Sequence, residues 1–68
     1  MVVRINGEER EVGQGMSVLE LLSHLGVAYK DVGLAVSING EVILKKDYQS
    51  KYIQEGDSVE VIHLVGGG

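Results

Sequence analysis

The sequence predicts an α+β fold in which a mixed sheet of four to five strands carries one helix packed on one of its faces. Three observations favour this class. Asn-Gly dipeptides at residues 6–7 and 39–40 each follow a run of alternating apolar and polar residues, which is the strongest short signal for a β-hairpin. A single stretch with helical spacing lies between them, and a last alternating run covers residues 58–64. A chain of 68 residues has room for one small domain, which we assign to residues 1–64.

The first hairpin is expected to lie at an edge of the sheet. Residues 1–6 alternate as a strand, and Asn6 and Gly7 both tolerate the positive φ of a tight hairpin turn. The return strand, residues 8–12, is rich in Glu and Arg, and such side chains discourage pairing with other sheets. Its three glutamates could form a metal or acid–base site. We interpret them as a solvated face, because no His or Asp lies near them in the sequence.

The predicted helix begins after Ser17, since Ser17 and Glu20 have the spacing of a capping box. An apolar stripe follows at positions i, i+3, i+4 and i+7, made by Val18, Leu21, Leu22 and Leu25. Gly26 stands where a helix commonly ends in a left-handed residue, which gives a helix of two to three turns. His24 lies off the stripe, and we interpret it as a surface residue because no second metal ligand stands at a suitable spacing.

The second hairpin combines a strand at residues 34–39 with a short return strand at residues 42–44. A polar connection follows at residues 45–52, with room for a helical turn. Its three lysines and two tyrosines are open to two interpretations: a binding rim, or amphipathic side chains that cover the open end of the core. A tight turn that uses Gly56 for positive φ then leads into the last strand.

The last strand is expected to be apolar on both faces, with Val59 and Val61 on one side and Ile62 and Leu64 on the other. One helix covers only one face of a sheet, so we place Val59 and Val61 in the core. Ile62 and Leu64 then face outward, immediately before the glycine end. We interpret His63 as a partly exposed residue rather than a catalytic base.

Composition removes several classes of function. The formal net charge is −4 and no Lys/Arg stripe is present, which argues against nucleic acid and suits a basic partner or simple solubility. The absence of cysteine rules out disulfides, thiolate nucleophiles and Cys-type zinc sites. No long apolar run indicates a signal peptide or a membrane span, so we expect a cytoplasmic protein without a membrane partner.

The chain closes with Val65-Gly66-Gly67-Gly68, and we predict a flexible glycine tail over residues 65–68. Glycine has no Cβ, so such a tail can thread a channel too narrow for other residues. Four extended residues reach at most about 13–14 Å, enough to place a terminal carboxylate inside a partner while the domain stays outside. Taken alone, the tail is equally open to interpretation as a frayed terminus or an expression remnant.

The order strand, strand, capped helix, strand, short strand, turn, strand and Gly-Gly end resembles the ubiquitin-like β-grasp fold. The turn Glu55-Gly56-Asp57, the Val-rich strand after it and the glycine end are together similar to the ThiS family of sulfur carriers for thiamine biosynthesis. The likeness covers essentially the whole chain in length, in the positions of the Asn-Gly turns and in the terminus.

The resemblance implies a specific chemistry. An ATP-dependent adenylyltransferase of the ThiF type would activate the carboxylate of Gly68, and sulfur from a donor protein would replace AMP to give a thiocarboxylate. Thiazole synthase would then take that sulfur. The chain would be a cosubstrate and not an enzyme, with no metal and no cofactor of its own, since the partner uses the ATP. The remaining implied contacts are Gly66 and Gly67 threading the partner's site, and Ile62, Leu64 and Val65 docking on its surface.

Other functions stay open at this point. The small subunit of molybdopterin synthase shares the fold and the Gly-Gly end, although those chains tend to be longer. A ubiquitin-like protein modifier would form an amide with a substrate lysine, and a plain interaction module would need no chemistry at its end. A regulatory domain cut from a larger protein is a further alternative, against which Met1 and the glycine end argue.

Overall fold

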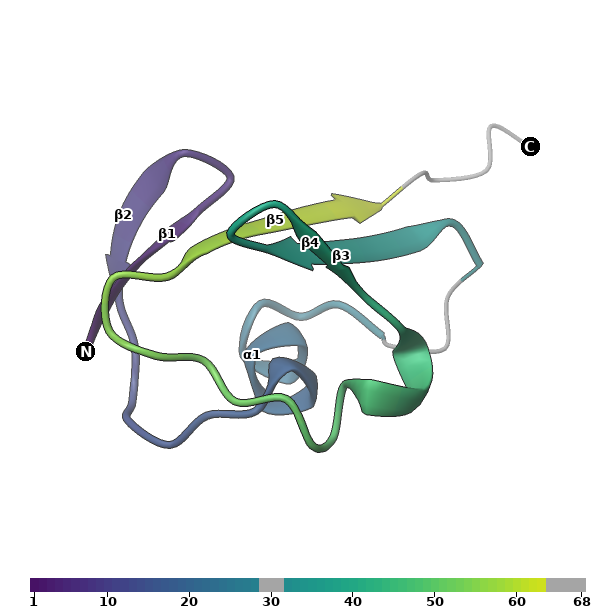
Figure 1. Cartoon of the computed structure of the whole chain (residues 1–68), viewed down its shortest axis with the longest axis horizontal. Coiled ribbons are helices and arrows are strands. Elements are labelled where there is room, and N and C mark those ends of the chain that lie inside the picture. Colours follow the sequence, from purple (N-terminus) through teal and green to yellow (C-terminus); the bar gives the residue numbers. More distant parts are fainter. Residues whose placement is uncertain (29–31, 64–68) are drawn as a thin grey trace.

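The computed structural model describes residues 1–28 and 32–63, and within them it shows five strands and one α-helix (Figure 1). The elements are β1 (Val2–Ile5), β2 (Glu8–Glu11), α1 (Val18–His24), β3 (Leu34–Ile38), β4 (Glu41–Ile43), the 3₁₀ helix η1 (Lys45–Asp47) and β5 (Ser58–His63). The strands form one sheet in the order β2-β1-β5-β3-β4. The helix lies across one face of that sheet (Figure 1), which confirms the predicted α+β class.

The last strand occupies the centre of the sheet and separates the two hairpins. It runs parallel to β1, where Arg4 lies opposite Ser58 and Ile5 opposite Val59. It runs antiparallel to β3 along all five residues of that strand. The sheet is therefore mixed, and β5 has a long ladder on one side and a short one on the other.

Both hairpins turn on the predicted Asn-Gly pairs. Asn6 and Gly7 have φ of 53° and 83°, and Asn39 and Gly40 have φ of 52° and 83°. Positive φ at both central residues matches the right-handed twist of the flanking strands, which explains why asparagine and glycine stand there. The β1–β2 hairpin lies at the edge of the sheet, as expected, and every residue of β2 is exposed.

The helix has the predicted capping box at its start. The backbone N–H of Glu20 donates to Ser17 Oγ over 3.1 Å, and the N–H of Ser17 donates to Glu20 Oε1 over 3.0 Å. After the C-cap residue Leu25, Gly26 has φ of 76°, the left-handed conformation that ends many helices. The side chains of Val18, Leu21 and Leu22 are buried against the sheet.

The core fills the space between the sheet and α1. Its buried apolar side chains are Val3, Ile5, Val12, Val18, Leu21, Leu22, Leu34, Val36, Ile38, Ile43, Tyr48, Ile53 and Val59. Val61 is half-buried and packs against this cluster. The alternation of the strands and the helical stripe thus predicted most of these core residues, and Val12 and Tyr48 are exceptions.

The expectation that Val12 belongs to the polar, exposed return strand is wrong. β2 ends at Glu11, and the Val12 side chain is only 7% exposed. The N–H of Val12 donates to the carbonyl oxygen of Met1 over 2.8 Å, and the amino group of Met1 donates to the Val12 carbonyl oxygen over 2.7 Å. This pairing continues the β1–β2 register, which puts Val12 on the face that α1 covers.

The connection after β4 supplies a core residue from an otherwise polar segment. Tyr48 follows η1 and is 2% exposed, and its carbonyl oxygen accepts the N–H of Leu19 over 2.9 Å. The binding-rim interpretation is therefore wrong for Tyr48, which covers the open end of the core. Burial raises the pKa of Tyr48 above its ordinary value. Tyr52, by contrast, is exposed.

Candidate functional site

The candidate site is the end of β5, from which the chain continues to the predicted tail. The tail itself lies outside the described residues, as does the predicted domain boundary between residues 64 and 65; the residues concerned are Leu64, Val65, Gly66, Gly67 and Gly68. The site that the structure defines is therefore the end of β5, residues 61–63, with the side chains around it; we call it the base of the tail.

Ile62 lies on the face of the sheet opposite the helix. Its neighbour in sequence, Val61, packs against the core, whereas the Ile62 side chain is 52% exposed. The outward orientation of Ile62 is thus as expected, because successive side chains of a strand point to opposite faces. Its docking role stays a prediction.

The exposed apolar surface around Ile62 extends across two further strands. Ala35 of β3 lies directly opposite Ile62, and Val42 of β4 lies opposite Ser37, two residues along the same face. Val42 is 69% exposed, and Leu44, which continues in extended conformation after β4, is 56% exposed. We call Ala35, Val42, Leu44 and Ile62 the outer patch.

Sequence reasoning missed Val42 and Leu44 as candidate site residues, although a signal was present. Residues 42–44 are three apolar residues in a row, and a strand at the sheet edge turns only alternate residues to the core. The structure buries Ile43 and leaves its two neighbours exposed. Large apolar side chains gathered on an exposed sheet face are typical of a protein–protein contact.

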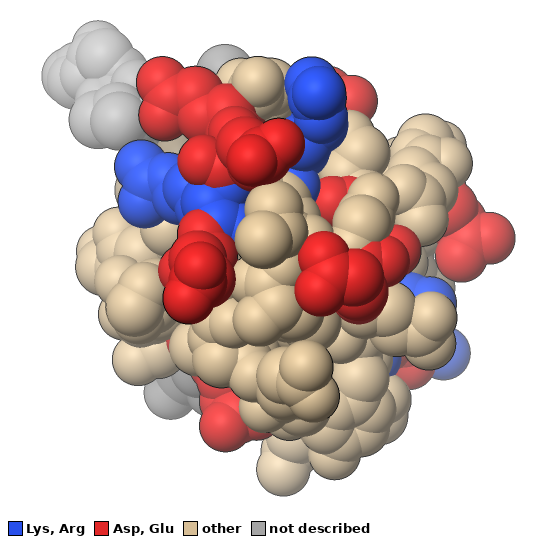
Figure 2. Space-filling view, turned by 90° about the vertical axis from the view of Figure 1, so that its left-hand side faces the viewer, with Lys and Arg blue, Asp and Glu red and all other residues tan. Residues whose placement is uncertain are grey.

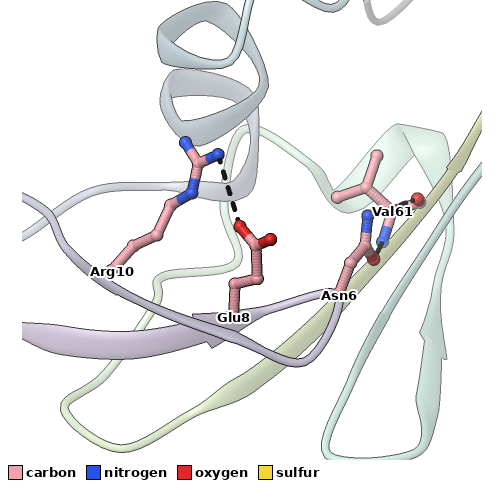
Figure 3. A network of polar contacts seen from close by, with 4 residues as sticks. All are labelled: Asn6, Glu8, Arg10 and Val61. Carbon is pink, nitrogen blue, oxygen red and sulfur yellow. Dashed lines mark hydrogen bonds and ion pairs between the residues drawn. The ribbon is translucent and has the colours of Figure 1, made fainter.

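The side chain of Asn6 hydrogen-bonds to the backbone of β5 at Val61, at the base of the tail (Figure 3). Its side-chain Nδ2 donates to the carbonyl oxygen of Val61 over 3.1 Å, and the N–H of Val61 donates to Asn6 Oδ1 over 2.8 Å. The backbone N–H of Asn6 also donates to the carbonyl oxygen of Val59 over 2.9 Å. The sequence indicated Asn6 only as a turn residue, so this second role was missed.

The side chain of Asn39 hydrogen-bonds to the backbone of the same strand at its first residue, Ser58. The N–H of Ser58 donates to Asn39 Oδ1 over 3.0 Å, and the N–H of Asn39 donates to the Ser58 carbonyl oxygen over 2.8 Å. Asn39 Nδ2 donates to Asp57 Oδ1 over 3.0 Å. The two asparagines therefore bind β5 from opposite sides, Asn39 at its first residue and Asn6 at Val61.

A hollow of about 400 Å³ opens beside Val61, on the face of the sheet that carries the helix. Four of its lining residues are apolar and four are polar or charged: Ile5, Leu25, Val27 and Val61 against Asn6, Glu8, Arg10 and His63. A surface hollow with this lining can receive an apolar side chain of a partner that covers the base of the tail.

Charged side chains gather on one part of the molecular surface. Acidic side chains are spread over the end of the molecule that the β1–β2 hairpin forms, with basic ones beside some of them (Figure 2). Arg10 Nη2 lies 3.9 Å from Glu8 Oε2, and because both side chains are at least half exposed this pair is worth about 0–1 kcal/mol (Figure 3).

The glutamates of β2 and the two histidines are the side chains that the sequence offered as possible metal ligands. In residues 1–28 and 32–63, no three His, Cys, Asp or Glu side chains are placed to hold a metal ion. His24 ends α1 and His63 ends β5, and both are exposed. Among the helices in the described part of the chain, none is both long and apolar enough to cross a bilayer.

Comparison with known proteins relates this chain to one family. The chain matches the model of the ThiS family over residues 3–68. It is 37% identical over 67 residues to the sulfur carrier protein ThiS of Thermus thermophilus, which covers 98% of this chain and 100% of that protein. It is also similar to the crystal structure of a thiamine biosynthesis protein (ThiS) from Geobacter metallireducens, with a TM-score of 0.83, 34% identity and 100% of both chains covered.

A much longer protein also contains a segment like this chain. The thiazole synthase of Paramagnetospirillum magneticum is 40% identical to it over 68 residues. That match covers 100% of this chain and 20% of the synthase, so the chain spans about a fifth of this relative's length.

Proposed function

The chain belongs to the ThiS family, and from this premise we propose that it is a sulfur carrier for thiamine synthesis whose reacting group is the carboxylate of Gly68. The observation that carries the proposal is the family match over residues 3–68, which includes that glycine. The ubiquitin-like β-grasp fold supports it, because the described residues fold as the ThiS crystal structure does.

The chemistry follows from the properties of a carboxylate. An oxide is a poor leaving group, so sulfur cannot displace it directly. A ThiF-type adenylyltransferase joins the carboxylate to the AMP part of ATP and releases pyrophosphate. Sulfide supplied by the donor protein then adds to the carbonyl carbon, AMP leaves with the bonding electron pair, and loss of the sulfur-bound proton leaves the chain ending in a thiocarboxylate. Gly68 has no side chain to obstruct this attack.

In this proposal the chain is a cosubstrate and not an enzyme. ATP is bound and consumed by the partner, and the chain contributes the acyl group and a docking surface. The outer patch docks on the adenylyltransferase, with Ile62 nearest in sequence to the tail. Gly68 follows six residues later, so its carboxylate reaches at most about 20 Å from Ile62. Gly66 and Gly67 thread the partner's channel, and Leu64 and Val65 extend the docking contact.

Thiazole synthase is the proposed receiver of the sulfur. The segment within the Paramagnetospirillum magneticum thiazole synthase that resembles this chain supports this assignment, because joining a carrier to its enzyme raises their effective concentration. We place the carrier in the cytoplasm, where ATP for the adenylation is available.

Intact-mass spectrometry tests the proposal. The chain is incubated with a ThiF-type adenylyltransferase, ATP and sodium sulfide as the sulfur source. We expect a mass increase equal to the difference between one sulfur and one oxygen atom. Conjugates to lysine without that species would contradict the carrier role and support a protein modifier instead.

The matched control is the chain without Gly68, which ends in Gly67. It should stay unmodified, because the shortened tail holds its carboxylate about 3.3 Å short of the partner's reaction centre. Modification at the wild-type rate would show that the position of the terminal carboxylate does not matter.

A further inference from the structure

We propose that Asn6 is a positioning residue, which holds the last part of β5 in place and so directs the chain that follows toward the partner. This inference rests on the proposed function, because it assigns Asn6 a part in delivering Gly68. The residue is far from the tail in sequence: its side-chain bonds to Val61 span 55 positions.

The need for such a residue arises from the unequal ladders on the two sides of β5. β3 pairs with β5 as far as His63, but β1 pairs with it only at Ser58 and Val59. Among residues 1–28 and 32–63, therefore, no strand lies beside β5 on its β1 side beyond Val59. A strand paired on one side only is more easily displaced, and displacement here would change where the tail starts.

The side-chain amide of Asn6 makes the hydrogen bonds to Val61 that a neighbouring strand would otherwise make. A carboxamide has the same donor and acceptor groups as a peptide unit, so it can bind both the N–H and the carbonyl oxygen of Val61, as the two bonds of 2.8 and 3.1 Å show (Figure 3). The bond from the Asn6 N–H to Val59 fixes the base of this side chain. One residue thus extends the β1 ladder by a further step along β5.

Few side chains satisfy both requirements at this position. The turn demands positive φ, which asparagine, aspartate and glycine accept most readily. Aspartate offers two acceptors and no donor, so it keeps at most the bond from the Val61 N–H. Glycine keeps the backbone conformation and removes both side-chain bonds, which makes Asn6→Gly the cleanest variant.

Asn39 supplies a matched control within the same chain. It has almost the same φ, is followed by glycine and also binds the backbone of β5, but at Ser58. Asn39→Gly therefore removes comparable bonds from the end of β5 that is remote from the tail. A general loss of stability would affect both variants, whereas a positioning role belongs to Asn6 alone.

The test combines hydrogen exchange with adenylation kinetics. In the wild-type chain the Val61 amide should be protected from exchange by NMR, and Asn6→Gly should lose that protection. The KM of the adenylyltransferase for the Asn6→Gly chain should rise about fivefold to thirtyfold with little change in kcat, because about one more residue must be ordered on binding. Asn39→Gly should keep the Val61 protection and a near wild-type KM, and Asn6→Asp should fall between.

Three results would overturn the inference: an unprotected Val61 amide in the wild-type chain, a wild-type KM for Asn6→Gly, or equal rises in KM for both glycine variants. If Asn6→Gly does not fold, Asn6→Asp and the wild-type exchange decide by the same criteria. Failure of the wild-type chain to be adenylated would instead overturn the proposed function, while the exchange data would still report on the contact between Asn6 and Val61.

Discussion

At the scale of single residues, Asn6 and Asn39 each do two things in this molecule. Each adopts the positive φ of a hairpin turn, and each also uses its side-chain amide to bind the backbone of β5. The first property is local and can be read from the dipeptide. The second depends on where β5 lies in the sheet. The same residue type thus encodes a turn and a contact between distant segments.

Tyr48 gives a pH dependence that tests its burial. Burial disfavours the tyrosinate, so the pKa of Tyr48 in the folded state lies above 10.0, the value expected for the unfolded chain. As the pH rises through 10.0, the unfolded chain releases this proton while the folded chain keeps it. The unfolded state then binds fewer protons, so the free energy of unfolding falls with rising pH until the folded pKa is reached.

We therefore expect Tyr48→Phe to lose part of the decline in stability that the wild-type chain shows above pH 10.0. The measurement is the free energy of urea unfolding across this range. Tyr52→Phe is the control, because the Tyr52 side chain is exposed. Equal slopes for Tyr48→Phe and the wild-type chain would show that the Tyr48 hydroxyl is solvated in the folded state.

At the scale of secondary-structure elements, β5 connects the fold to the proposed function. Its position between the hairpins buries Val59, while its alternation turns Ile62 outward beside Ala35. β5 thus contributes one side chain to the core and another to the outer patch. It is also the central strand of the sheet, and the predicted tail follows it directly.

Variants of the outer patch test the docking surface. Ile62→Gln and Val42→Gln should each raise the KM of the adenylyltransferase about fivefold or more, since loss of an apolar anchor at an interface costs above about 1 kcal/mol of binding. Both side chains are more than half exposed, so the free energy of unfolding should change by about 0.5 kcal/mol or less.

Val2→Gln is the control for this pair. Val2 is an exposed apolar residue of β1, outside the patch and on the far side of β5 from β3 and β4. It should leave the KM unchanged. A similar KM effect for all three variants would indicate that general surface hydrophobicity, and not the outer patch, determines the affinity.

At the scale of the whole molecule, the core formed by the described residues lies within the five strands, the helix and their connections. Every buried apolar residue in the described part of the chain lies between Val3 and Val59. A domain of this size buries only about 60% of the surface of its unfolded chain, so each core residue matters to its stability. We predict that residues 65–68 take no part in this packing.

Removing residues 65–68 tests this division. A chain that ends at residue 64 should unfold in urea with a free energy within about 0.5 kcal/mol of the wild-type value, because its described core is intact. It should also show the same near-native dispersion of NMR signals. A clear loss of stability would mean that the glycine tail packs against the domain and is not held out for a partner.

Much of this molecule could be predicted from local patterns. The Asn-Gly turns, the Ser17–Glu20 capping box, the helical stripe and the outward side of Ile62 were all predicted and confirmed. Each depends on φ preferences or on the period of a helix or strand, which act over a few residues and therefore appear directly in the sequence.

The remaining features were settled by contacts between distant residues. Val12 is buried because it pairs with Met1 on the face of the sheet that α1 covers. Tyr48 is buried because it follows η1, where the chain packs against the core. The hydrogen bonds between Asn6 and Val61 form because β5, the last strand in the sequence, pairs with β1, the first. The sequence alone thus determined the elements, their turns and the family resemblance. Only the tertiary structure decided which side chains close the core, which ones form the outer patch and what holds the strand that leads to Gly68, because those outcomes depend on which distant segments pack together.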